Sequence, residues 1–118
     1  MDNVYEIGIL MDFYGQLITE RQYQIMDLHY NNDYSLGEIA QLLNISRQGV
    51  YDNIKKGKQL LYEFEKKLGL VERFRQQKDV CEEALSLMEN VIKGECDKKN
   101  IKDLSRVRDL LIRLRELL

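Results

Sequence analysis

The sequence has no proline and no tryptophan, only two cysteines and one histidine. Because proline interrupts helices, its absence permits long ones. No stretch approaches the roughly 20 consecutive apolar residues that span a bilayer. The first three residues, Met1, Asp2 and Asn3, also lack the basic start of a signal peptide. We therefore expect a cytosolic protein with no membrane partner.

The few residues suited to chemistry form no recognisable catalytic pattern. Cys81 and Cys96 lie outside any CxxC motif, so both are expected to be reduced thiols. His29 sits beside an apolar run, which favours a structural or surface role. The Glu82-Glu83 pair lies among counter-charges, as is typical of a solvated helix face. Without a P-loop or a nucleophile elbow, we expect no enzyme, no metal and no cofactor.

The composition is that of a soluble helical domain. Of 118 residues, 44% are hydrophobic and 32% are charged, and this length can bury a core without disulfides or metal. We predict one domain, residues 1–118. The net charge of −2 is unevenly distributed, with −5 over residues 1–34, +2 over residues 35–69 and +1 over residues 70–118. An anion would therefore bind in the middle third.

Apolar residues recur at helical spacing along the whole chain, which predicts an all-α fold of about six helices. Two capping boxes mark helix starts, Thr19 with Gln22 and Ser35 with Glu38. Ser46 is expected to cap a longer helix. The expected helices cover residues 4–14, 20–30, 36–43, 47–68, 70–92 and 100–118.

The helix expected over residues 47–68 has one buried stripe, on which Gly57 also falls. Glycine inside a helix costs about 1 kcal/mol relative to alanine. Gly57 therefore suggests close packing or a bend, although an exposed glycine fits the pattern as well. Gly69 is the expected C-cap. The other members of the stripe are Val50, Ile54, Leu61, Phe64 and Leu68.

Residues 70–118 are predicted to form a helical self-association element. The buried residues expected in its first helix are Phe74, Cys81, Ala84, Leu85, Met88, Val91 and Ile92. Asn100 with Asp103 is expected to start the last helix, which has a seam of Leu104, Val107, Leu111, Leu114 and Leu118, widened by Ile101, Leu110, Ile112 and Leu117. One neighbour does not easily cover so wide a face. We therefore predict exposed leucines and a homodimer, with a monomer whose last helix folds back across both neighbours as the alternative.

Residues 19–58 have the spacing of a helix-turn-helix. Such a module needs a small residue where its helices touch, a turn residue that tolerates positive φ, and an apolar residue on the second helix. Ala40, Asn44 and Val50 occupy these places. Ser46 would cap the second helix and leave its first amides directed at an anion.

The segment Tyr34-Ser-Leu-Gly-Glu-Ile-Ala-Gln-Leu-Leu-Asn-Ile-Ser-Arg-Gln-Gly-Val-Tyr51 resembles the core of sigma-factor region four. Residues 1–70 are also similar to the YlxM family in the motifs Asp12-Phe-Tyr-Gly15, Leu17-Ile-Thr-Glu-Arg-Gln22, Tyr34-Ser-Leu-Gly-Glu-Ile-Ala40 and Ile45-Ser-Arg-Gln-Gly-Val-Tyr-Asp-Asn-Ile54. This resemblance implies a helix-turn-helix regulator. Because the family is encoded beside signal recognition particle genes, it also implies, by association only, a part in that protein-targeting pathway.

If the module binds DNA, the contacts are expected from seven residues of the recognition helix. Arg47 or Gln48 would meet base edges, and phosphates would be met by Ser46, Tyr51, Lys55, Lys56 and Lys58. Residues 46–58 carry a net charge of +3. Asp52 would repel the phosphate backbone, so weak binding is expected. A solvated face with no ligand is the alternative.

Two functions fit these observations. The first is a DNA-binding regulatory protein that reads DNA with residues 35–58, and the basic recognition helix favours it. The second is a helical adaptor that binds protein or RNA components of the signal recognition particle and keeps the helix-turn-helix as a scaffold. Asp52 and the overall acidity favour the second.

Overall fold

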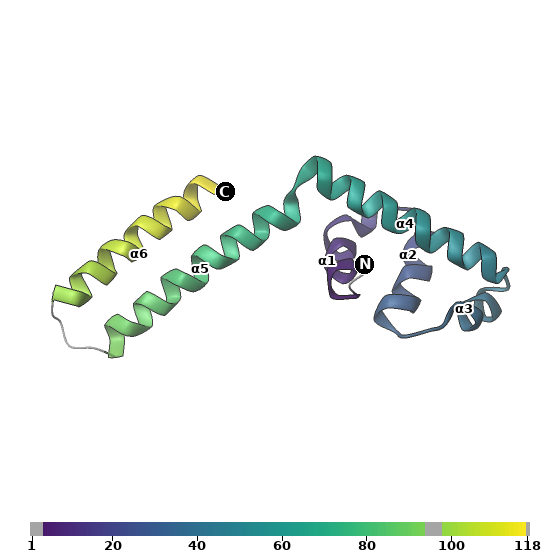
Figure 1. Ribbon diagram of the computed structural model, residues 1–118, viewed down its shortest axis with the longest axis horizontal. Helices are drawn as coiled ribbons and strands as arrows, with labels where there is room; N and C mark the ends of the chain where they lie inside the picture. The colour runs from purple at the N-terminus through teal and green to yellow at the C-terminus, as the bar shows by residue number, and fades with distance from the viewer. Residues whose placement is uncertain (1–3, 94–97, 118) are drawn as a thin grey trace. The chain divides into compact units, whose positions relative to one another are not determined.

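The computed structural model describes residues 4–93 and 98–117, which form helices and their connections with no strand among them. The α-helices are α1 (Val4–Tyr14), α2 (Glu20–Met26), α3 (Leu36–Leu43), α4 (Arg47–Leu68), α5 (Leu70–Lys93) and α6 (Lys98–Leu117) (Figure 1). A 3₁₀ turn, η1 (Gly15–Leu17), precedes α2, and a π-helical turn, η2 (Asp27–Asn31), continues it. The predicted all-α fold is confirmed.

The starts of α2 and α3 are fixed by the two predicted capping boxes. The Thr19 hydroxyl accepts a hydrogen bond from the Gln22 amide at 3.1 Å, and the Gln22 side chain accepts one from the Thr19 amide at 3.0 Å. Ser35 and Glu38 make the same reciprocal pair, both bonds at 3.1 Å. Each box satisfies amides that the first turn of a helix leaves unpaired. Both helices therefore begin where the sequence predicts.

Contacts within the chain divide it into two compact units, Met1–Val71 and Glu72–Leu118. The helix-turn-helix lies in the first unit. The second unit nearly coincides with the predicted self-association element of residues 70–118. The single domain predicted for residues 1–118 stays a prediction.

In the first unit α4 is the central helix, because it packs against α1, α2 and α3 (Figure 1). Of the stripe predicted for α4, Phe64 is partly buried, whereas Leu68 is exposed. Leu68 lies in the last turn, directly before the Gly69 cap, so its assignment to the core was wrong. The most deeply buried residues of the unit are Ile7, Leu10, Met11, Tyr14, Ile25, Met26, Ile39, Val50 and Leu61.

Gly57 is buried where α4 crosses α2. A Cβ atom at this position would overlap the Sδ atom of Met26 and would lie 3.7 Å from the Cβ of Gln22. Met26 is itself fully buried. The absence of a side chain at position 57 therefore lets Met26 pack directly on the α4 backbone, which confirms the close-packing interpretation.

A polar cluster at the end of α4 holds the first turn of α5. The Tyr14 hydroxyl donates to Glu65 Oε1 at 2.5 Å and accepts from the Leu70 amide at 3.1 Å, and the same Glu65 oxygen accepts from the Val71 amide at 3.0 Å. Gly69 between the helices has a φ of 63°, which favours glycine. Glu65 and Tyr14 thus satisfy the first α5 amides in place of an N-cap residue.

The second unit is an antiparallel hairpin of α5 and α6. Gln77 Nε2 donates to the Leu117 carbonyl at 3.2 Å, which joins the beginning of α5 to the end of α6. Arg106 Nη2 donates to Glu83 Oε1 at 3.1 Å nearer the middle of the two helices. Between the helices lie the buried residues Val80, Ala84 and Leu110, flanked by Leu87, Leu114 and Leu117.

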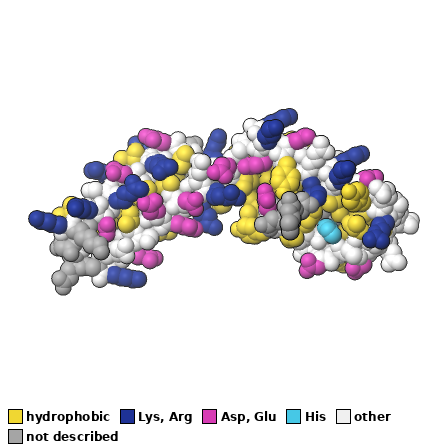
Figure 2. Space-filling model, in the orientation of Figure 1, with side chains coloured by type: hydrophobic (Ala, Val, Ile, Leu, Met, Phe, Trp, Pro, Cys, Tyr) yellow, Lys and Arg dark blue, Asp and Glu magenta, His cyan; other side chains and the backbone are white. Residues whose placement is uncertain are grey.

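The predicted core of this hairpin needs correction. Phe74, Leu85 and Met88 were expected to be buried and are exposed, whereas Val80 was not singled out and is buried. Apolar residues cover so much of α5 that their spacing alone does not identify the side facing α6. Leu104 and Leu111 are exposed, which confirms the exposed leucines predicted for α6. Figure 2 shows apolar side chains at the surface of the hairpin, among charged ones.

The start of the last helix was also predicted wrongly. Because α6 already includes Lys98, Asn100 lies inside the helix and does not cap it. Its side chain is buried. Cys81 is a free thiol. Cys96 and Leu118 lie outside the described residues, as does the side chain of Ile92.

A matched pair of glycine substitutions tests the packing at Gly57. Gly8 lies in α1, and a Cβ atom added there would meet nothing within 4 Å, so Gly8→Ala should raise the free energy of unfolding by about 0.5–1 kcal/mol through helix propensity. Gly57→Ala has the same gain in helix propensity, but its methyl group overpacks against Met26. The free energy of unfolding should therefore fall by about 1–3 kcal/mol. Equal stabilisation of both variants in urea unfolding would contradict the close approach.

Because of Tyr14, the stability of the first unit should decrease with rising pH in the alkaline range. Burial, together with the hydrogen bond to Glu65, raises the pKa of the Tyr14 phenol above 10.0. The folded state thus holds this proton more tightly than the unfolded state. Its contribution is complete below pH 10 and is lost as pH rises through the raised pKa. The stability difference between wild type and Tyr14→Phe should therefore shrink with rising pH, and a constant difference in urea unfolding across this range would refute the assignment.

Candidate nucleic-acid interface

The turn between α3 and α4 has the geometry that a helix-turn-helix requires. Asn44 ends α3 in the left-handed region, with φ 55° and ψ 47°, and the Ile45 amide donates to the Ala40 carbonyl at 3.1 Å. Ser46 then caps α4, its Oγ accepting from the Gly49 amide at 2.9 Å. The turn residue and the cap are both as predicted. The chain therefore enters α4 in a fixed direction.

Buried side chains hold the two helices of the module together. Ile39 of α3 and Val50 of α4 are fully buried, and Ile54 nearly so. Ala40 is partly buried beside them. Because Val50 and Ile54 are four residues apart, they fix which side of α4 faces the core. The opposite side of its first half is thereby directed outward.

Most of the predicted contact residues lie on this outward side, and Ser46 and Arg47 are exposed at the start of α4. We call the outward side together with this exposed start the reading face. Exposed residues of the set are Ser46, Arg47, Gln48, Tyr51, Lys55 and Lys56. Lys58, the seventh, is only partly exposed and already interacts with a neighbour. It is therefore the least accessible of the predicted phosphate contacts.

Gln48 and Asp52 form a pair that was not among the predictions from the sequence. The Gln48 amide nitrogen donates to Asp52 Oδ1 at 3.0 Å along the exposed side of the helix. This i, i+4 spacing is the signal that would have revealed it. The pair orients Gln48 and places a carboxylate in the middle of the reading face, so Arg47 is the stronger candidate for a base-edge contact.

The single histidine is structural. A carbonyl can only accept, so His29 Nδ1 donates to the Tyr34 carbonyl at 2.8 Å, while the Tyr34 amide donates to the Leu28 carbonyl at 3.0 Å. The imidazole also meets the ring of Tyr30 edge-on, with centroids 4.9 Å apart. These contacts fix the connection that leads into α3, in agreement with the role expected from the sequence.

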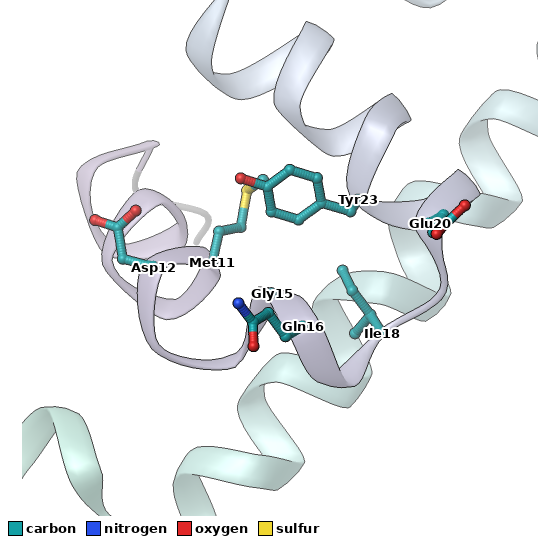
Figure 3. A pocket seen from close by; sticks show the side chains of 7 residues that line it. All are labelled: Met11, Asp12, Gly15, Gln16, Ile18, Glu20 and Tyr23. Carbon is teal, nitrogen blue, oxygen red and sulfur yellow. The ribbon is translucent and has the colours of Figure 1, made fainter.

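An open pocket of about 540 Å³ lies elsewhere on the first unit, between α1, η1 and α2. Tyr23 extends from α2 toward Met11 and Gly15, and Asp12 and Glu20 lie at the edge of the pocket (Figure 3). A Cβ at Gly15 would come within 2.7 Å of the Tyr23 ring, so the glycine makes room for this ring. The acidic edge is unsuited to phosphate, and the pocket is not part of the reading face.

Two further classes of site can be assessed over the described residues. Across residues 4–93 and 98–117, no group of three or more His, Cys, Asp or Glu side chains is placed to hold a metal ion. Within the same ranges, no helix has the length and apolar character needed to cross a membrane.

Residues 1–114 match the model of the family described as "Putative helix-turn-helix protein, YlxM / p13 like". The chain belongs to this YlxM/p13-like family. It is 54% identical to the UPF0122 protein of Acetivibrio thermocellus, over 92% of this chain and 93% of the relative. It is 39% identical to a UPF0122 protein of Oceanobacillus iheyensis, over 93% of this chain and 98% of the relative.

Membership of the YlxM/p13-like family agrees with the resemblance identified from the sequence motifs. The match extends through α5 and nearly to the end of α6, well beyond the residues 1–70 on which that resemblance rested. The family description names a helix-turn-helix, and α3, Asn44 and α4 supply its geometry in this chain.

Proposed function

We propose that this protein is a cytosolic DNA-binding regulatory protein that reads duplex DNA with the outward side of α4. The observation that supports this most is the reading face itself, since the Ser46 cap and the buried residues Val50 and Ile54 hold a basic helix start outward on a rigid support. In helix-turn-helix proteins this part of the second helix lies in the major groove.

The exposed residues divide by position into two roles. Arg47 stands at the first position of α4 and contacts a base edge. Tyr51, Lys55 and Lys56 lie one or two turns further along and contact phosphates. Ser46 adds a hydroxyl beside the first α4 amides, which favour an anion. Gln48 is held by Asp52 and contributes less.

Substitutions at the two kinds of position should differ in their effects on DNA binding. Arg47→Ala should cost roughly 1–3 kcal/mol and do so unequally among sequences, whereas Lys55→Ala should weaken all sequences about equally and lower the salt slope by about 1. Lys67→Ala, an exposed lysine in the last turn of α4, is the control and should bind as wild type. Fluorescence anisotropy with promoter duplexes at two salt concentrations measures all three.

If wild type, Arg47→Ala and Lys55→Ala bind DNA with equal affinity, or if none binds, the proposal is wrong. Circular dichroism shows whether each variant keeps its helical content. Because all three positions are exposed, loss of folding is not expected to obscure the comparison.

The alternative function is a helical adaptor for protein or RNA of the signal recognition particle system. The Asp52 carboxylate favours it, because a negative charge in the middle of the reading face opposes phosphate. The net charge of −5 over residues 1–34 favours it as well. In this function the helix-turn-helix is a scaffold, and DNA does not contact α4.

Asp52→Asn separates the two functions. Asparagine keeps an acceptor for Gln48 but removes the charge, so a DNA-binding protein should gain affinity for every duplex, by roughly threefold to tenfold for one removed repulsion. An adaptor should gain nothing. Glu63→Gln, which changes the same charge on an exposed residue about four turns from the start of α4, is the matched control and should leave DNA affinity unchanged.

A further inference from the structure

We propose that the α5–α6 hairpin binds a second copy of this chain through one exposed apolar face, with α6 of one copy lying against α5 of the other. This inference concerns the second unit, Glu72–Leu118. It is independent of the proposed DNA binding.

Most residues of this exposed apolar face come directly after a residue of the hairpin core in the sequence. On α5, Leu85 follows the buried Ala84 and Met88 follows Leu87. On α6, Leu111 follows the buried Leu110, and Leu104 lies two turns before Leu111. The exposed fractions are 63% for Leu85, 39% for Met88, 52% for Leu111 and 47% for Leu104. We call these four residues the apolar face.

Both halves of the apolar face lie on the same side of the hairpin. A step of one residue turns about 100° around a helix, so Leu85 and Leu111 are each rotated by this angle from a side chain that points at the opposite helix. Because α5 and α6 are antiparallel, the two rotations run in opposite senses when seen from one end. Two helices that face each other therefore direct Leu85 and Leu111 to the same side.

The α6 half of this face is hollowed. A shallow groove of about 440 Å³ is lined by Leu104, Val107, Leu111 and Ile112, with Arg108 and Arg115 beside them. Large apolar residues gathered on one surface usually mark an interaction site. Two such hairpins, face to face, would bury these side chains in a four-helix arrangement.

Charge identifies a second copy as the partner. Arg108 and Arg115 are exposed within the α6 half, and Glu82 and Glu89 are exposed along the outer edge of α5. The sequence of α5 includes no base over residues 79–92, so this stretch of the edge is acidic, whereas Arg75 and Lys78 precede it and Lys93 follows it. A two-fold axis that sets α6 on the partner's α5 brings Arg108 beside the acidic stretch of that helix. Setting α6 on α6 would instead bring the arginines of both copies together.

The hairpin's own register predicts which charges meet. Glu83 and Arg106 are bonded across it at 3.1 Å, so positions 82 and 108 lie at about the same height along the helices. A two-fold axis parallel to the helices preserves height. Arg108 of one copy therefore approaches Glu82 of the other, and the reverse pair forms by symmetry.

The first test is the mass of the full-length protein in solution. By sedimentation velocity at micromolar concentration the wild type should be a dimer, and Leu111→Glu should raise the dimer dissociation constant at least about 100-fold by burying a charge. Arg113→Glu alters an exposed residue away from the apolar face and should remain a dimer. Circular dichroism should show wild-type helix content for both variants. A monomeric wild type, or a Leu111→Glu variant that dimerises normally, would overturn the proposal.

The second test exchanges the charges. Glu82→Arg alone opposes arginines at both sites of the dimer, and Arg108→Glu alone opposes glutamates, so each should dimerise about tenfold more weakly or worse. In an equimolar mixture of the two variants, the heterodimer has opposite charges at both sites, so the mixture should associate more tightly than either variant alone. If the mixture associates no better than either variant alone, α6 does not lie on the partner's α5 and the proposed arrangement is wrong.

Discussion

The close approach of Gly57 and Met26 determines the geometry of the first unit. It lets α2 lie directly on the α4 backbone, so that Val50 and Ile54, earlier on α4, reach the core beside Ile39. A larger residue at position 57 would push α2 away from α4. The cavities opened between the two helices would lower the stability of the fold. The orientation of the reading face therefore depends on Gly57, a buried residue that is not part of that face.

Helix ends in the first unit were predictable because the signals are local. A capping box places a side-chain acceptor and its amide within four residues, and Asn44 and Gly69 both adopt the positive φ expected of helix C-caps. The Tyr14–Glu65 cluster was not predictable, because its residues are 51 positions apart. Nothing in the sequence near either residue indicates that they meet.

The hairpin was harder to predict for a different reason. Periodicity identifies a buried side only when polar residues clearly mark the other sides. On α5, Leu85 and Met88 are as apolar as Val80 and Ala84, and the choice between them depends on where α6 lies. On α6, the width of the apolar face correctly indicated that some leucines stay exposed, since no single neighbour covers so wide a face.

For the candidate interface, the sequence predicted which residues point outward but not how they restrain one another. Tyr51 and Lys55 are exposed because they lie on other sides of α4 than the buried Val50 and Ile54. Arg47 lies on the side of Val50 and is exposed at the first residue of the helix. The bond between Gln48 and Asp52 depends on rotamers and changes what the face presents. In the proposed DNA binding, a single reading face with one carboxylate among its bases would make few phosphate contacts. Two copies joined through their hairpins would add their salt slopes and make the second binding event intramolecular, so a face that is weak alone would suffice in a dimer.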